Sequence, residues 1–138
     1  MTTLAERVKE HLRTLPAVRL AAVFGSVARG TSHARSDLDL AIRLDPDSDS
    51  MDLRRKVEVS LARALGCTVD VIYMDEAPPL LRFEIARDGL LMVESRPYEW
   101  ADFKVRAALD WYDWKPYADR INAAAVQRLR EKVAHGPA

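Results

Sequence analysis

The sequence has only one cysteine, five glycines and no excess of charge of either sign. A single cysteine, Cys67, excludes an internal disulfide and cannot form a zinc site alone. Lysine plus arginine equals aspartate plus glutamate at 21 each, so the formal net charge is zero. No overall field therefore attracts nucleic acid or an anionic membrane, and any polyanion must be held locally.

Long apolar segments are also missing from the sequence. No uninterrupted apolar run approaches the ~18 residues of a membrane span. The N-terminal stretch MTTLAERVKEHLRTL is amphipathic and lacks the apolar core of a signal peptide. We therefore expect a cytoplasmic protein with no membrane partner. The length of 138 residues is near the commonest size of one domain.

Helical and extended periodicities alternate along the first two thirds of the chain. Helices are expected from a capping box at Thr3 and Glu6, from the apolar stripe between Leu53 and Leu65, and after Pro78. Strands are expected at residues 18–24, 38–44, 68–74 and 90–93. These elements predict an α+β fold, with a core over residues 1–96 and a helical extension of the same domain over residues 97–138.

The C-terminal extension is expected to hold two helices divided by Pro116. Trp100, Phe103, Ala107 and Trp114 recur at near-helical intervals, which predicts that they pack onto the sheet. Any aromatic surface that stays exposed there would form a partner-binding surface.

The stretch GSVARGTSHARSDLD, residues 25–39, carries the clearest chemical signal. A glycine-serine pair directly after a buried strand gives a tight turn with free N–H groups and a hydroxyl, which suits phosphate oxygens. Asp37 and Asp39 stand on one face of the next strand, with Cα atoms ~6.5 to 7 Å apart. Two such carboxylates repel unless a cation lies between them, and magnesium with a triphosphate supplies that cation.

Two other phosphate-binding motifs do not fit this stretch. Gly25, Gly30 and Thr31 partly match a P-loop, but the lysine is absent and a strand replaces the expected helix. The G-x-G-x-x-G fingerprint of dinucleotide-binding folds does not occur.

Glycine-serine, a ten-residue spacer and Asp-Leu-Asp closely resemble the signature of the nucleotidyltransferase superfamily typified by DNA polymerase beta. The ARG at 28–30 and SDLDL at 36–40 are also similar to the minimal nucleotidyltransferases, many of which are antitoxins paired with a HEPN-domain toxin. The resemblance covers residues 18–93. It implies a mixed nucleotidyltransferase-type sheet flanked by helices, ATP as substrate and two Mg²⁺ ions.

The same resemblance implies roles for individual residues. Asp37 and Asp39 would bind the metal ions, and Asp70 matches the third carboxylate, which helps bind the catalytic metal and activates the attacking hydroxyl. The nucleotide would be bound by Gly25, Ser26, Arg29 and Ser36. Asp70 also has an argument of its own, because it is the only charged residue in an apolar strand and a buried carboxylate is costly unless paired or metal-bound.

The acceptor of the nucleotide is expected to come from a partner protein. Only residues 97–138 follow the core, and no basic stripe predicts stable nucleic-acid binding. The resemblance then implies a type VII-like antitoxin that transfers AMP from ATP to a tyrosine of a HEPN toxin. Two alternatives remain open: a stand-alone transferase that modifies a small hydroxyl compound such as an aminoglycoside, and a non-catalytic antitoxin that neutralises by binding.

Overall fold

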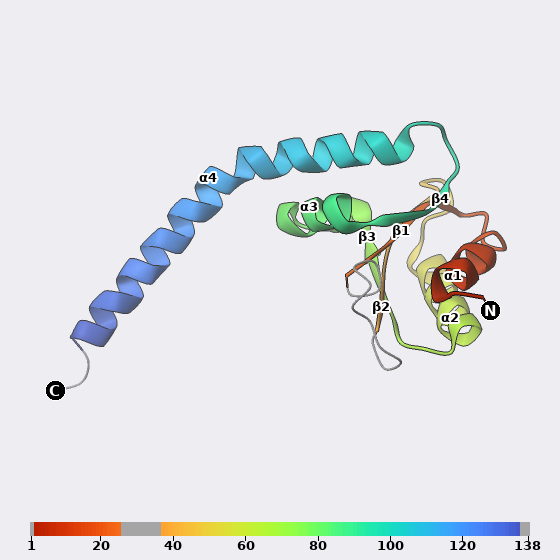
Figure 1. Cartoon of the computed structure of the whole chain (residues 1–138), viewed down its shortest axis with the longest axis horizontal. Coiled ribbons are helices and arrows are strands. Elements are labelled where there is room, and N and C mark those ends of the chain that lie inside the picture. Colours follow the sequence, from red (N-terminus) through yellow and green to blue (C-terminus); the bar gives the residue numbers. More distant parts are fainter. Residues whose placement is uncertain (1, 26–36, 136–138) are drawn as a thin grey trace.

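The computed structural model describes residues 2–25 and 37–135, which form a mixed four-stranded sheet with helices on both faces (Figure 1). The described strands are β1 (Val18–Phe24), β2 (Leu38–Leu44), β3 (Val69–Tyr73) and β4 (Leu90–Glu94). The described helices are α1 (Leu4–Leu12), α2 (Met51–Leu65), α3 (Pro79–Asp88), α4 (Glu99–Ala134) and a short 3-10 turn, η1 (Met74–Glu76). The predicted α+β fold class is confirmed.

Local sequence signals fix the ends of the first two helices. Thr3 and Glu6 form the predicted capping box, in which the Thr3 hydroxyl accepts from the Glu6 N–H and the Glu6 carboxylate accepts from the Thr3 N–H. Ser50 caps α2, and Gly66 ends it with a positive φ of 64°. These caps set where α1 begins and where α2 begins and ends.

The sheet has the strand order β3-β2-β1-β4. β1 pairs antiparallel with both β2 and β4. β2 pairs parallel with β3, and the helix α2 is the crossover that connects these two strands along the chain. β3 is therefore an edge strand. This arrangement brings the end of β1 and the starts of β2 and β3 to the same end of the sheet.

Each face of the sheet has its own hydrophobic core. α1 and α2 cover one face, where the buried residues include Val8, Leu12, Leu40, Ile42, Val57 and Leu61. α3 and the first part of α4 cover the other face, where they include Leu20, Ala22, Ala41, Ile85, Phe103 and Ala107. Asp39 belongs by strand alternation to this second face, because it lies two residues before Ala41.

α4 differs from the sequence prediction. Pro116 does not divide two helices but lies inside one helix of 36 residues, which bends near its middle in Figure 1. A proline removes one backbone hydrogen bond, and the helix continues because the freed carbonyl lies on an exposed segment where water can reach it.

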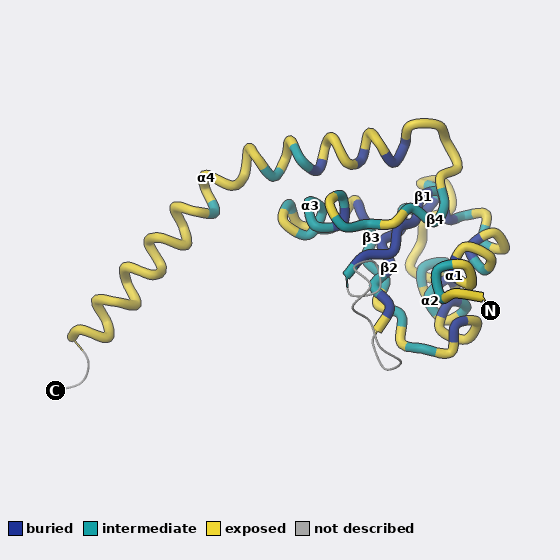
Figure 2. The backbone as a smooth tube through the Cα atoms, viewed as in Figure 1, coloured by how far each residue is buried: buried dark blue, intermediate teal, exposed yellow. Residues whose placement is uncertain are grey.

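The predicted packing of the aromatic segment holds only for its first part. Trp100, Phe103 and Ala107 are buried, but Trp114 is 42% exposed, so its predicted packing onto the sheet is wrong. The part of α4 that extends past α3 lies away from the sheet and is mostly exposed (Figure 2). No described helix is both long enough and apolar enough to cross a membrane.

Candidate active site

Asp39 lies where β2 begins, beside the last residue of β1. Phe24 and Asp39 are direct partners in the antiparallel ladder, so the turn that follows β1 starts next to the Asp39 side chain. Gly25 occupies the first position of this turn with φ of 74°, a conformation that favours glycine. A Cβ atom at residue 25 would overlap the Asp39 carboxylate, so any larger residue would displace that side chain.

Asp70 is the direct partner of Asp39 on the neighbouring strand. The parallel ladder of β2 and β3 pairs Leu38 with Val69 and Asp39 with Asp70. Partners in adjacent strands lie ~4.8 Å apart and point to the same face. Two carboxylates that the sequence separates by a whole crossover helix therefore stand side by side at one end of the sheet.

The prediction that Asp70 is buried is wrong. Asp70 is exposed, and β3 is an edge strand of the sheet. The cost of burying a carboxylate therefore gives no reason for Asp70 to bind a metal. Its register with Asp39 gives a better one, since two like charges on neighbouring strands repel each other unless a cation is shared.

Asp37 lies just before β2 and is exposed. The ladder reaches this point, because the Leu38 N–H donates to the Thr68 carbonyl at 3.0 Å. Among the described residues, which include Asp37, Asp39 and Asp70, no three acidic, histidine or cysteine side chains lie close enough to hold a metal. In their present positions the three carboxylates therefore do not converge on one ion site, as the sequence had predicted they would.

The donor chemistry nevertheless suits magnesium, which prefers a few carboxylate oxygens together with water and phosphate oxygens. Asp39 and Asp70 would hold such an ion, and Asp37 would need to turn toward it. The other predicted nucleotide-binding residues, Ser26, Arg29 and Ser36, lie outside the described residues, so their roles stay predictions.

A partly buried ion network on the same face of the sheet was not predicted from the sequence. The Glu99 carboxylate at the start of α4 accepts from Arg19 of β1 at 2.7 Å and from Arg43 of β2 at 3.3 Å, and Arg43 also binds Asp75 at 2.7 Å. Burial would lower the Arg43 pKa, but the hydrogen bonds and charges of Asp75 and Glu99 outweigh it and raise that pKa. The network anchors α4 to the sheet that carries Asp39.

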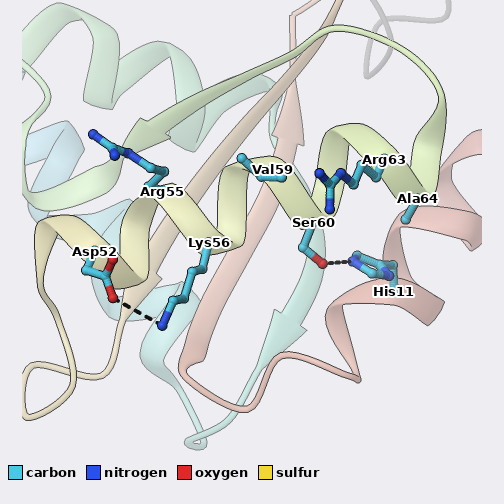
Figure 3. Close-up of a pocket in the computed structure, with 8 residues that line it drawn as sticks. All are labelled: His11, Asp52, Arg55, Lys56, Val59, Ser60, Arg63 and Ala64. Atoms are coloured by element: carbon cyan, nitrogen blue, oxygen red, sulfur yellow. Dashed lines mark hydrogen bonds and ion pairs between the residues drawn. The ribbon is translucent and has the colours of Figure 1, made fainter.

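A pocket of about 730 Å³ lies elsewhere, between α1 and α2 (Figure 3). His11 and Ser60 are hydrogen-bonded at 2.7 Å in this pocket, and Lys56 is paired with Asp52 at 3.1 Å. It opens on the sheet face opposite to that of Asp39 and Asp70. The pocket is therefore separate from the candidate active site.

Comparison with known families decides what kind of site this is. Residues 6–98 match the family described as polymerase beta, nucleotidyltransferase, which is more than half of the chain. The chain belongs to the polymerase beta nucleotidyltransferase family. The match includes both strands that carry Asp39 and Asp70, as well as Gly25, so these residues belong to the family's domain.

Two relatives are similar over about half of this chain. Protein adenylyltransferase MntA of Shewanella oneidensis is 31% identical over 75 residues, which are 54% of this chain and 53% of the relative. A Methanocaldococcus jannaschii protein, provisionally named a protein adenylyltransferase, is 32% identical over 73 residues, which are 53% of this chain and 77% of the relative. The similarity thus spans about half the length of the Shewanella protein.

Solved structures share the fold over most of the chain. A chain from the crystal structure of a toxin-antitoxin complex with AMP-PNP has a TM-score of 0.75 at 23% identity, and covers 88% of this chain and 98% of its own. A chain from the complex of a tri-AMPylated Shewanella oneidensis HEPN toxin with an MNT antitoxin has a TM-score of 0.70 at 19% identity, covering 89% and 96%. At these identities the likeness establishes the fold.

Proposed function

We propose that this protein is a metal-dependent adenylyltransferase that moves AMP from ATP to a tyrosine of a HEPN-domain toxin and thereby neutralises the toxin. The pairing of Asp39 with Asp70 beside Gly25 carries the chemical part, because it places two carboxylates next to a glycine with a positive φ at one end of the sheet. The family match supports nucleotidyl transfer as the reaction.

The choice of acceptor is supported by the relatives. One of them is named a protein adenylyltransferase, and one structural neighbour comes from a complex that holds a tri-AMPylated HEPN toxin. Asp37 and Asp70 are exposed at the carboxylate end of the sheet. A tyrosine delivered by another protein can reach this open edge.

The transfer balances as a displacement at the α-phosphorus of ATP. The tyrosine oxygen forms the new P–O bond, the bond to the leaving pyrophosphate breaks, and the tyrosine proton passes to Asp70 or to water. Magnesium, bound as two ions, would supply charge stabilisation for the attacking and leaving oxygens. Asp39 and Asp70 would hold the ions with Asp37, while Gly25 keeps the turn against the Asp39 carboxylate and Ser26, Arg29 and Ser36 bind the triphosphate.

The decisive experiment is incubation with MgCl₂, labelled ATP and a HEPN protein, to be sought in the neighbouring reading frames by its R-x-x-x-x-H motif. Intact mass analysis should show one or more AMP units on the HEPN protein. Asp39→Asn should lose transfer by about 100-fold or more, whereas Asp47→Asn, an exposed aspartate of the turn after β2, should retain it.

The remaining alternatives give different results in the same experiment. A HEPN protein that is inhibited but carries no AMP would identify a non-catalytic antitoxin and defeat the proposed reaction. Transfer to an aminoglycoside without any partner would identify a stand-alone enzyme.

A further inference from the structure

The outer part of α4, residues 113–134 and here called the outer arm, packs against no other described element. α3 accompanies α4 only as far as two contacts. Phe83 stacks on Trp111 and meets the Tyr112 ring edge to face, and Arg82 binds Asp110 at 2.9 Å. Beyond that point the ring contacts and side-chain hydrogen bonds of the arm lie within it, such as the stacking of Trp114 on Tyr117. The arm is ~33 Å long at helical rise, and Figure 2 shows it exposed.

The outer arm nevertheless carries large apolar side chains in the open. Trp114, Tyr117, Ile121, Val126, Leu129 and Val133 are between 42% and 75% exposed. At 100° per residue, Tyr117, Ile121, Trp114 and Leu129 fall on one stripe about 120° wide. Ala123 and Gln127 lie on the opposite side. An isolated helix that contains a proline gains little stability in water, so this stripe needs an apolar surface to cover it.

A second copy of the chain fits the stripe poorly. A coiled coil needs apolar residues at alternating steps of three and four. Such a seam would begin at Trp114, Tyr117, Ile121 and Ala124, but its next two positions are the charged Arg128 and Glu131. The apolar residues instead continue in steps of four through Ala125, Leu129 and Val133. Such a row winds around the helix and suits helices that cross at about 50°.

The net positive charge of the outer arm indicates that its partner surface carries acidic side chains. It carries five cationic and three acidic side chains, and Arg128, Arg130 and Lys132 gather at its end around a single acid, Glu131. A matching surface would be an apolar groove between helices with acidic side chains at one end.

We propose that the outer arm is the docking element for the HEPN toxin, and that the toxin covers the stripe with an apolar groove bordered by acidic residues. Only the identity of this partner rests on the proposed function. The arm holds the toxin by a contact separate from the carboxylate edge, so binding and AMP transfer are divided between two parts of the chain. The arm thus raises the local concentration of the acceptor without taking part in the chemistry.

A matched pair of double variants tests this division. Ile121→Asp with Leu129→Asp adds two charges to the stripe, and Ala123→Asp with Gln127→Asp adds two charges to the opposite side. All four positions are exposed, so both variants should fold as the unchanged protein does. Isothermal titration calorimetry with the HEPN protein should show at least about 100-fold weaker binding for the stripe variant and less than threefold change for the other.

The outcomes separate docking from catalysis. Asp39→Asn should bind the toxin normally without transferring AMP, while the stripe variant should raise the KM for the toxin and keep kcat. Normal toxin binding by the stripe variant would overturn the docking assignment and leave the proposed function standing. A chain that dimerises through the stripe, measured by light scattering, would also overturn it, and a chain that binds no HEPN protein would overturn both.

Discussion

Gly25 lies directly against the carboxylate of Asp39, so closely that a Cβ atom at residue 25 would overlap Oδ2 of that side chain. The contact exists because β1 and β2 are antiparallel and Phe24 is the ladder partner of Asp39. The glycine therefore has two separate physical requirements, a positive φ and free space. The second requirement ties the turn directly to a predicted metal ligand.

We predict that Gly25→Ala lowers AMP transfer by about 100-fold or more, since a displaced carboxylate no longer holds its productive position. The free energy of unfolding should fall by only about 1–2 kcal/mol, the cost of a positive φ at alanine. Urea denaturation and the AMP-transfer assay measure the two effects.

Gly66→Ala is the matched control for this substitution. Gly66 also has a positive φ, 64°, but no atom lies within 4 Å of the position that its Cβ would take. The control should show a similar loss of stability with unchanged transfer. Equal loss of transfer in both variants would mean that backbone strain, and not the Asp39 contact, is responsible.

The register of Asp39 and Asp70 predicts how metal binding depends on Asp70. Asp70→Asn should reduce the affinity for Mg²⁺ with AMP-PNP by at least about tenfold, because one anionic oxygen donor is lost. In EDTA the same variant should be at least as stable as the unchanged protein, because one of two neighbouring like charges is removed. Calorimetric titration and thermal unfolding measure both quantities, with Asp47→Asn as the control. Unchanged affinity in Asp70→Asn would exclude Asp70 as a ligand.

The sequence predicted the helices and strands better than it predicted which strands lie side by side in the sheet. Helix caps and strands depend on local patterns, so Thr3 with Glu6, the apolar stripe between Leu53 and Leu65 and the pattern of residues 38–44 were sufficient to predict them. The exposure of Asp70 could not be predicted, because periodicity does not show that β3 lies at the edge of the sheet. Strand order is decided by tertiary pairing, and only the structure places Asp70 opposite Asp39.

The C-terminal helix shows a different limit of sequence reasoning. Proline usually ends a helix, but Pro116 is tolerated on an exposed segment where water can satisfy the freed carbonyl. Nor could any local pattern indicate that Glu99 meets Arg19 and Arg43, which lie far away in the sequence. Such contacts follow from how α4 crosses the sheet.

The loss of stability on acidification should depend in part on Arg54. Hydrogen bonds from Arg54, at 2.9 Å to Asp49 and 2.7 Å to Glu76, lower the pKa of Asp49 below 3.8 and that of Glu76 below 4.5. A carboxylate with a lower pKa in the folded state stabilises it above its unfolded pKa, here pH 4.5 for Glu76, and loses that contribution as the pH falls through the folded value.

We therefore expect Arg54→Gln to lower the free energy of unfolding near pH 7, and the difference from the unchanged protein to shrink as the pH falls below 4.5. A constant difference should remain, because Arg54 also lies over the Tyr73 ring at 4.0 Å. Urea denaturation across this pH range measures the effect. Lys56→Gln, which breaks only the exposed pair with Asp52, should change little at any pH. A difference that stays equal from pH 7 to pH 3 would contradict the linkage to the two carboxylates.

Glu99 should be the residue that fixes α4 to the sheet. Its side chain is 8% exposed and bridges the guanidinium groups of Arg19 and Arg43, so Glu99→Gln leaves Arg19 partly buried without a counter-charge while Arg43 keeps Asp75. We expect a loss of about 2–4 kcal/mol in the free energy of unfolding, with a change in the fluorescence of the adjacent Trp100. Asp102→Asn, one turn further along α4 and 60% exposed, should cost less than about 0.5 kcal/mol. If both variants were equally stable, water would be solvating the two arginines, and the packing of Phe103 and Ala107 alone would hold the helix in place.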